Sequence, residues 1–425
     1  MNSISVPTRI FTVLLTVFVA VTAAGKGFHR YNKKVPGVYI VEVAHKDAVV
    51  IRRLARELTT APGARLIDTY TEVLGGFSAE LTEEQAIAIS QLPDIKDVHE
   101  AIQGEVIEVP NTTTVAATSW GLDRIDQRAL PLDQFYTYSY RGTNVKVYVI
   151  DTGVDIVGDL VGRVKQRVTF AGAGLGDCYS VGAGHGTLVA STIGGSMYGV
   201  ARNVDIISVR TVCTGSQGAP TMVTALNWVV QQHLADPGAM SVANISVRYD
   251  IYDPLDEAVR DAIAAGVTVV VGAGNDGDNA CNSSPQRSGN PAYIPNNPNG
   301  YNAITVAASD IDDHVSVWGG GFESNTGPCV DLFAPGGPGL TAQGWNGVSN
   351  AWQGTSAAAP HVTGLVAQAY GKYGSITPGM AENYILVNAT PNVITSNPAA
   401  TNPIRSGTPN KLAFGLPPKR RACCS

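Results

Sequence analysis

The 425-residue sequence lacks the features of several large classes of protein. Basic residues are not in excess, because 29 Lys and Arg stand against 35 Asp and Glu, and the formal net charge is -6. This balance argues against a nucleic-acid-binding surface. No apolar run reaches the roughly 20 residues that a membrane-spanning helix needs. We therefore expect neither a nucleic acid nor a membrane among the partners of this chain.

Cysteine is also scarce, with only six residues in the chain. No CxxC pair or Cys/His cluster has the spacing of a zinc site. Cys423 and Cys424 lie in a basic tail, residues 416–425, where Ala422 occupies the position that a prenylated cysteine would need. We interpret this tail as disordered or trimmed. The other four cysteines permit three pairings, so their number alone selects none.

The first 24 residues are typical of a secretory signal peptide. Arg9 supplies a positive charge, residues 10–21 are apolar, and small residues follow at 22–24. The resulting prediction is a secreted, extracellular protein, in surroundings where disulfides can form. The chain is longer than most single domains, which favours one large domain and a smaller one.

Residues 25–115 form the smaller predicted domain, with a core at residues 35–109. Its segments follow the order strand, helix, strand, strand, helix, strand, which suits a small ferredoxin-like α+β unit. Thr82 precedes acidic residues that would lie beside the positive end of a helix dipole. The clearest strands are residues 37–43, 75–81 and 95–100, and the first helix is residues 47–58.

Residues 109–115 have the composition of a linker, and the larger predicted domain, residues 116–415, follows. In it, apolar and β-branched strands alternate with helices. This α/β pattern indicates a mostly parallel sheet with helices on both faces. The predicted strands are residues 145–150, 204–212, 242–246, 267–271 and 303–307, and the predicted helices are residues 222–234 and 255–265.

Three short motifs carry an acid, an imidazole and a hydroxyl. Asp151 ends the apolar strand in a DTG sequence, His185 begins HGT after a glycine-rich loop, and Ser356 lies in GTSAAAPH. A serine hydroxyl is a poor nucleophile until a base takes its proton. His185 is the candidate base, and Asp151 would orient it and stabilise its protonated form. Asp151 also lies at the carboxyl end of a strand, where open α/β sheets place ligands.

Two groups could stabilise a developing oxyanion. Ser356 precedes the apolar run 357–370, which we interpret as a buried helix whose amino end offers free N–H groups. Pro360 would be tolerated there only near the first turn. Asn275, in GAGNDG after a buried strand, would supply a side-chain amide. Such a donor is worth about 10²–10³ in turnover.

Each of these four residues also has a structural interpretation. Asp151 and Asn275 could form turns, His185 could cap a surface helix, and Ser356 could be an N-cap. Their joint occurrence in the order Asp, His, Ser favours catalysis. An α/β-hydrolase esterase has another order and needs a glycine two residues after its serine, which this chain lacks.

These motifs resemble the subtilase superfamily, and within it the proteinase K and aqualysin branch. The resemblance covers residues 120–412 and includes WGLDRID at 120–126 and VYVIDTG at 147–153. It implies a subtilisin-like fold and a secreted serine endopeptidase that works through an acyl-enzyme, with broad preference for apolar or aromatic P1 residues. We expect a monomer that uses no cofactor for its chemistry. A catalytically silent, protease-like binding protein is the alternative.

The region before the catalytic domain resembles the subtilisin propeptide. That resemblance implies an intramolecular inhibitor and folding chaperone that is removed autocatalytically, between Asn111 and Ser119. The substrates implied for the mature enzyme are proteins and peptides.

The resemblance also implies two disulfides and one metal ligand. It pairs Cys178 with Cys213 and Cys281 with Cys329. Asp331 resembles a calcium-binding aspartate, and a hard carboxylate suits a structural calcium ion. A solvated or helix-facing aspartate is the other interpretation of Asp331.

Substrate binding is implied for two segments that follow strands. Family members have Ser-Leu-Gly-Gly where this chain has Ser246, Val247, Arg248 and Tyr249, a segment that would pair with the substrate backbone. Arg248 would either favour acidic substrate side chains or point into solvent, and the second is favoured. The other substrate-binding residues implied are Gly272, Ala273 and Gly274.

Overall fold

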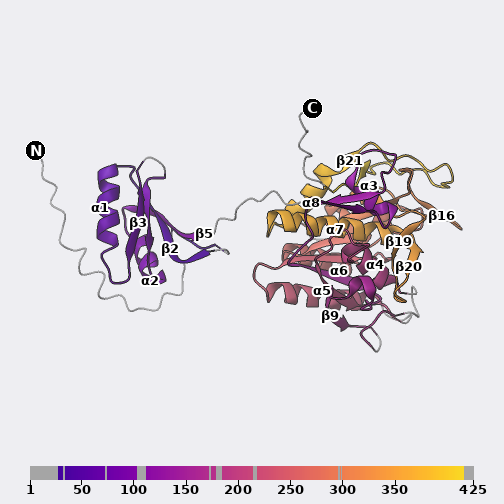
Figure 1. Ribbon diagram of the computed structural model, residues 1–425, viewed down its shortest axis with the longest axis horizontal. Coiled ribbons are helices and arrows are strands. Elements are labelled where there is room, and N and C mark those ends of the chain that lie inside the picture. Colours follow the sequence, from indigo (N-terminus) through magenta and orange to yellow (C-terminus); the bar gives the residue numbers. More distant parts are fainter. Residues whose placement is uncertain are drawn as a thin grey trace, which may run out of the picture. The chain divides into compact units, whose positions relative to one another are not determined.

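The computed structural model divides the chain into two compact units, Met1–Glu108 and Val109–Ser425. Each unit has its own sheet and its own hydrophobic core (Figure 1). The predicted signal peptide and the tail with Cys423 and Cys424 lie outside the described residues. No helix of the described part is long and apolar enough to cross a membrane. The structure describes residues 27–31, 34–71, 74–102, 112–171, 174–178, 184–213, 218–294, 297 and 299–415.

The first unit is a sheet with two helices. Its elements are β1 (Phe28–His29), β2 (Lys34–Val43), α1 (Ala48–Leu58), β3 (Arg65–Tyr70), β4 (Gly76–Glu80), α2 (Glu83–Ser90) and β5 (Ile95–Ile102). The strand order is β1-β5-β2-β4-β3, with β1 parallel to β5 and the other neighbours antiparallel. Strands β2 to β5 and the two helices have the predicted ferredoxin-like order. The core includes Val41, Ile51, Phe77 and Val98.

Both helices of this unit begin at capping residues. Asp47 accepts hydrogen bonds from the backbone N–H groups of Val49 and Val50 at the start of α1. Thr82 and Gln85 form a reciprocal capping box at the start of α2. These bonds satisfy N–H groups that would otherwise lack a partner within the helix.

The second unit is built on a nine-stranded sheet in the order β21-β22-β18-β15-β13-β11-β8-β10-β9. All neighbours are parallel except β21 and β22, which confirms the predicted mostly parallel sheet. Its strands are β8 (Val145–Asp151), β9 (Val164–Thr169), β10 (Asp205–Arg210), β11 (Met240–Ile245), β13 (Thr268–Gly272), β15 (Ile304–Ser309), β18 (Leu332–Pro335), β21 (Thr390–Pro391) and β22 (Lys411–Leu412).

Helices and short strand pairs surround this sheet. The helices are α3 (Trp120–Asp126), α4 (His185–Gly194), α5 (Ala219–Leu234), α6 (Asp253–Ala264), α7 (Thr355–Tyr373) and α8 (Pro378–Asn388). The small pairs are β6 (Thr113–Ala116) with β7 (Phe135–Tyr138), β12 (Tyr249–Asp250) with β14 (Ser283–Ser284), β16 (Val317–Gly319) with β17 (Phe322–Glu323), and β19 (Leu340–Gln343) with β20 (Ser349–Trp352).

Both faces of the large sheet are buried, because successive side chains of a strand point to opposite faces. In β8, Val147 and Val149 pack into a core with α4 and α7, while Tyr148 and Ile150 pack into a second core with α5 and α6. Figure 1 shows the sheet between these helix layers. The sequence is therefore apolar at nearly every strand position, as expected for a parallel sheet covered on both sides.

Candidate active site

An aspartate and a histidine meet at the carboxyl end of the central strand β8. Asp151 is the last residue of β8 and is fully buried. Its Oδ1 accepts hydrogen bonds from the backbone N–H of Thr152, at 2.7 Å, and from His185 Nδ1, at 2.8 Å. His185 is the first residue of α4. A carboxylate bound at Nδ1 holds the imidazole in one orientation and leaves Nε2 for proton transfer.

The surroundings of His185 favour its protonated form. Burial lowers the pKa of His185, but the charge and hydrogen bond of Asp151 and the charge of Asp177 outweigh burial, so the pKa is raised above its ordinary value. The side chain keeps 25% of its surface exposed. Trp352 packs against the ring edge to face, with centroids 6.2 Å apart. The imidazole is thus held firmly and remains accessible on one side.

Asp177 is a supporting residue that the motifs did not indicate. It accepts hydrogen bonds from the hydroxyls of Thr152 and Thr187, both at 2.6 Å, and from the Thr187 backbone N–H at 2.8 Å. Thr152 Oγ1 also accepts from the N–H of Gly186. These bonds tie the residue after Asp151 to the first turn of α4. Burial raises the pKa of Asp177.

Ser356 is the second residue of α7 and faces the segment after β11. Its Oγ donates to the backbone carbonyl of Ser246 at 3.3 Å, and Ser246 Oγ donates back to the Ser356 carbonyl at 3.4 Å. Pro360 explains why that carbonyl accepts a side-chain bond, since Pro360 is four residues on and has no N–H to offer. The expectation that Pro360 lies near the first turn is wrong, because α7 begins at Thr355 and continues to Tyr373.

Asn275 is oriented by the residue next to Ser356. Its Oδ1 accepts from both the backbone N–H and the hydroxyl of Thr355, at 2.9 Å each. Nδ2 is therefore the atom of the amide that remains to donate. A Cβ added to Gly354 would lie 3.5 Å from Asn275 Nδ2, 3.6 Å from Asn275 Oδ1 and 3.7 Å from Ser356 N, so the amide and this backbone nitrogen lie beside the same space. Gly354 has φ 122°, which favours glycine there.

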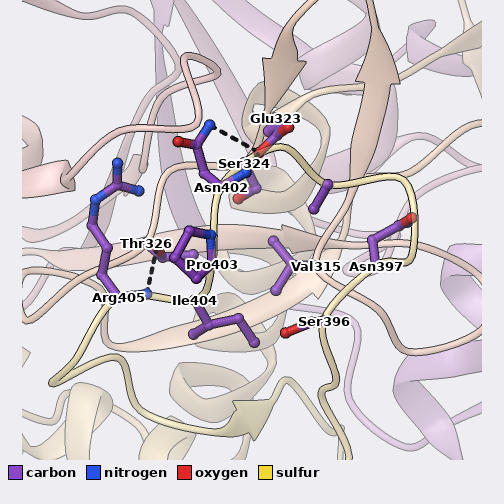
Figure 2. A pocket seen from close by; sticks show the side chains of 11 residues that line it. Val315, Glu323, Ser324, Thr326, Ser396, Asn397, Asn402, Pro403, Ile404 and Arg405 are labelled. Atoms are coloured by element: carbon purple, nitrogen blue, oxygen red, sulfur yellow. Dashed lines mark hydrogen bonds between the residues drawn. The ribbon is translucent and has the colours of Figure 1, made fainter.

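A second loop fixes the position of the Asn275 backbone. The Glu323 N–H donates to the Asn275 carbonyl, and Asn325 Oδ1 accepts from Asp276 N and Asp278 N. Figure 2 shows Glu323 itself facing Asn402, and its carboxylate accepts four bonds from residues 401 and 402. The small hollow between these loops has about 10 Å³, room for roughly one water. It is a packing feature rather than a ligand site.

The large hollow beside Ser356 has a volume of about 220 Å³. Of the predicted substrate-binding residues, Ala273 is buried and lies outside the lining. Arg248 does not offer a free positive charge, because it forms an ion pair with Asp276 at 3.0 Å. The lining residues are Ser246, Val247, Arg248, Gly272, Gly274, Asn275, Asp276, Gln286, Phe322, Thr355 and Ser356.

Gln286 joins the two walls of this hollow and is another residue that the motifs did not indicate. Its Nε2 donates to the carbonyls of Val247, at 3.1 Å, and Gly272, at 2.9 Å. These carbonyls belong to the segments that follow β11 and β13. The two hydrogen bonds fix the distance between the two walls.

Two disulfides flank the site. Cys178 pairs with Cys213 and Cys281 pairs with Cys329, the pairings that the resemblance implies. The first joins the approach to His185 with the segment after β10. The second joins the region after the Asn275 loop with the approach to β18. Each closes a loop of tens of residues and so restricts the unfolded chain.

Asp331 lies apart from these residues. Its Oδ2 accepts from the Thr305 backbone N–H at 2.7 Å. Burial raises the pKa of Asp331 well above its ordinary value, and the nearby charge of Glu382 raises it further. Burial also raises the pKa of Glu382. Two half-buried carboxylates are thus close enough for their charges to interact, with Lys411 as a partial counter-charge.

Comparisons with known proteins match both units. A family model described as the subtilase family matches residues 142–411, and one described as peptidase inhibitor I9 matches residues 33–101. An extracellular serine proteinase of Thermus sp. (strain Rt41A) is 38% identical over 340 residues, covering 78% of this chain and 75% of that protein. The alkaline serine protease ver112 of Corniculantispora psalliotae is 32% identical over 388 residues, 91% of each chain.

A solved structure matches as well. The crystal structure of a cold adapted subtilisin-like serine proteinase is similar with a TM-score of 0.60 and 36% sequence identity. The match covers 71% of this chain and 99% of that one.

Proposed function

Because the chain belongs to the subtilase family of serine-type endopeptidases, we propose that Asp151, His185 and Ser356 form its catalytic triad. The observation that carries this proposal is the 2.8 Å bond from His185 Nδ1 to Asp151 Oδ1. A hollow lined by Ser356 and Asn275 supports it. Family membership and the subtilisin-like fold confirm the resemblance seen in the motifs.

The proposed reaction begins with a turn of the Ser356 side chain. Its hydroxyl leaves the Ser246 carbonyl and faces His185 Nε2, which takes the proton as Oγ attacks the scissile carbonyl. Asp151 stabilises the imidazolium that results. The C–N bond then breaks, and His185 returns the proton to the leaving amine. Water attacks the acyl-enzyme by the same route, and Ser356 regains its proton.

The oxyanion of the tetrahedral intermediate would be held by Asn275 Nδ2 and the backbone N–H of Ser356. Support comes from the Asn275 amide and the Ser356 backbone nitrogen, which lie beside the same space at Gly354. Thr355 donates two hydrogen bonds to Asn275 Oδ1, and these bonds orient Asn275 Nδ2 toward the reacting carbonyl. Donors that are held before the reaction need no reorganisation as charge develops.

Substrate would bind as an added strand along residues 246–248. The described backbone has no strand partner at these residues, although β12 begins directly after them. The 220 Å³ hollow would take the P1 side chain, and we propose apolar or aromatic residues there. Pairing of Arg248 with Asp276 disfavours the idea that Arg248 selects acidic side chains. Digestion of a peptide library tests this preference.

The first unit would inhibit the second until it is removed. The inhibitor-family match over residues 33–101 supports intramolecular inhibition and protein substrates. Autocatalytic cleavage between Asn111 and Ser119, secretion and a monomeric state are parts of the same proposal. The extracellular relative of Thermus sp. supports secretion.

The Ser356→Ala variant tests the triad. It should accumulate as uncleaved precursor, because the cleavage needs the hydroxyl, while the matched control Ser406→Ala, an exposed serine, should mature normally. Gel electrophoresis with amino-terminal sequencing measures both results. If Ser356→Ala matures as the wild type does, the proposal is contradicted and the silent binding protein is favoured.

A structural calcium ion is a further proposal, and the family implies it. Asp331 would be its carboxylate ligand, and the half-buried pair of Asp331 and Glu382 fits an ion that prefers oxygen ligands. Such an ion would stabilise the fold rather than take part in the reaction. Chelation should lower stability by about 2.7 kcal/mol relative to calcium at 100 times its Kd. Thermal melting measures this, and an Asp331→Asn variant should lose the response to calcium.

A further inference from the structure

Two histidines and an aspartate gather on one face of the first unit, far in sequence from the residues of the proposed reaction. His29 on β1 is the register partner of His99 on β5. Asp97 is two residues before His99, so the pleat of β5 places both on the same face. The imidazoles of His29 and His99 are stacked, with centroids 4.3 Å apart and planes 9° apart. His29 Nε2 lies 2.9 Å from Asp97 Oδ1.

These three side chains bring one potential ligand atom each close together, and an ion would be bound once one of the two stacked imidazoles turns so that both ring planes meet at it. One nitrogen of each imidazole and one oxygen of Asp97 all lie within 4.8 Å of one another. In the described part of the chain, this is the one group of three such side chains that could hold a metal ion. A fourth donor is near, because Glu42 Oε1 lies 3.5 Å from His99 Nε2.

The hydrogen bonding of His99 is that of a histidine with one ring nitrogen available to bind a metal ion. Its Nε2 is buried and makes no hydrogen bond within the described residues, an arrangement that costs free energy unless the atom finds a partner. Its other nitrogen, Nδ1, lies 2.9 Å from the hydroxyl of Tyr31. Histidines that bind metals usually donate their second ring N–H to an oxygen, which fixes the tautomer. Tyr31 can accept that bond and so leaves Nε2 free to coordinate.

The local charge also suits a dication. Asp97 and Glu42 are two negative groups, and Lys96 is paired with Glu42 at 2.7 Å. With both imidazoles neutral, the cluster carries a net charge of about -1. A bound divalent cation would change this net charge to about +1, so little charge is left unbalanced. Nitrogen ligands select transition metals over calcium or magnesium, which prefer an all-oxygen shell.

We propose that His29, Asp97 and His99 form a binding site for a divalent transition metal ion of the zinc class. The ion replaces the proton that His29 Nε2 shares with Asp97. It joins β1, the two-residue strand at the edge of the sheet, to β5. Metal binding to the folded state adds its free energy to folding, so the ion stabilises the inhibitory unit. The site does not depend on the proposed triad.

The test uses the full chain carrying Ser356→Ala, stripped of metal with a chelator and then freed of the chelator. Zn²⁺ alone is titrated and binding is followed by calorimetry. His29→Gln and His99→Gln should each weaken binding at least about 10-fold, and Tyr31→Phe, which removes the hydroxyl that contacts His99 Nδ1, about 10-fold. His45→Gln, an exposed histidine of the same unit, is the matched control and should bind as the parent does.

Circular dichroism verifies that each variant folds. If His99→Gln fails to fold, His29→Gln still decides, because His29 is exposed on an edge strand. Zn²⁺ should also raise the melting temperature of the parent and of His45→Gln, and at the same Zn²⁺ concentration it should raise that of His29→Gln less. The proposal is overturned if the parent shows no binding, or if its affinity is unchanged in both His29→Gln and His99→Gln. Neither result bears on Ser356, since this protein lacks the hydroxyl in every arm.

Discussion

The two units of this chain are stabilised in different ways. The first unit covers its sheet with α1 and α2 around one small core, and two of its ion pairs, Arg30–Glu83 and Arg65–Glu80, are exposed at both residues. The second unit buries both faces of its sheet in two cores and adds two disulfides. No cysteine precedes Cys178 in the sequence, so the first unit cannot be cross-linked.

Buried ion pairs differ between the units as well, because Lys34, which pairs with the buried Glu100 of the first unit, keeps 46% of its side chain exposed. In the second unit, Arg124 is fully buried and binds Asp313 through two hydrogen bonds, at 2.7 and 2.9 Å. Removing one partner of such a buried pair strongly destabilises the fold, because the other charge is left buried and unpaired. Domains as small as the first unit bury a smaller share of their surface and are marginal in stability. The second unit therefore has more of the features that stabilise a fold, a difference that suits the proposed removal of the first unit.

Truncating a core side chain of the first unit should have the largest effect, and it should lower the stability of that unit alone. Phe77 is fully buried in β4, and Phe77→Ala should cost about 3–5 kcal/mol through lost contacts and a cavity. In a Ser356→Ala precursor, denaturant unfolding should then lose the first unit's transition and keep that of the second. Val49→Ala, which changes an exposed residue of α1, should alter neither transition. Equal loss in both units would contradict their separate stability.

Removing the side-chain amide of the site should act on turnover alone. Asn275→Ala should lower kcat by about 10²–10³, equal to about 2.7–4 kcal/mol, because one donor to the oxyanion is lost. KM should change little, and Asn282→Ala, which changes an exposed asparagine, should behave as the wild type. Steady-state kinetics on a peptide substrate measures both. A change confined to KM would show that Asn275 binds substrate rather than the oxyanion.

The pH dependence of the second unit is the smallest of these effects. The charges of Asp151 and Asp177 raise the pKa of His185, and a base acts only in its neutral form. Activity should therefore be present above that pKa and be lost as pH falls through it, at a higher pH than for an ordinary histidine of about 6.5. Asp177→Asn removes one of the charges and should move this acid limb to lower pH.

A profile of kcat/KM against pH measures the shift. Asp250→Asn, an exposed residue of β12, is the control and should leave the limb in place. An acid limb that stays unchanged in Asp177→Asn would show that Asp177 acts only through the hydroxyls it binds.

The sequence allowed much of the fold to be predicted, for reasons that differ between regions. The strands β8, β10, β11, β13 and β15 are apolar because both faces are buried, and that signal is local. The short strands β21 and β22, the last two at one end of the sheet, have two residues each and are set by long-range pairing, so no local pattern marks them.

The residues of the candidate site also differ in whether a local sequence pattern marks them. Residues that lie in short motifs, such as Asp151 and Ser356, could be proposed from sequence. Asp177, Gln286 and Glu323 could not, because each acts by a hydrogen bond to a segment distant in the chain. Pro360 misled the prediction because its missing N–H is compensated by Ser246, a residue on another element.

The most direct test of the account is covalent labelling of the mature enzyme with a fluorophosphonate, followed by peptide mapping in a mass spectrometer. The account predicts that the label is attached to Ser356 and that His185→Ala abolishes the reaction, since no base then activates the hydroxyl. Labelling at another residue, or labelling of His185→Ala as fast as the wild type, would contradict it.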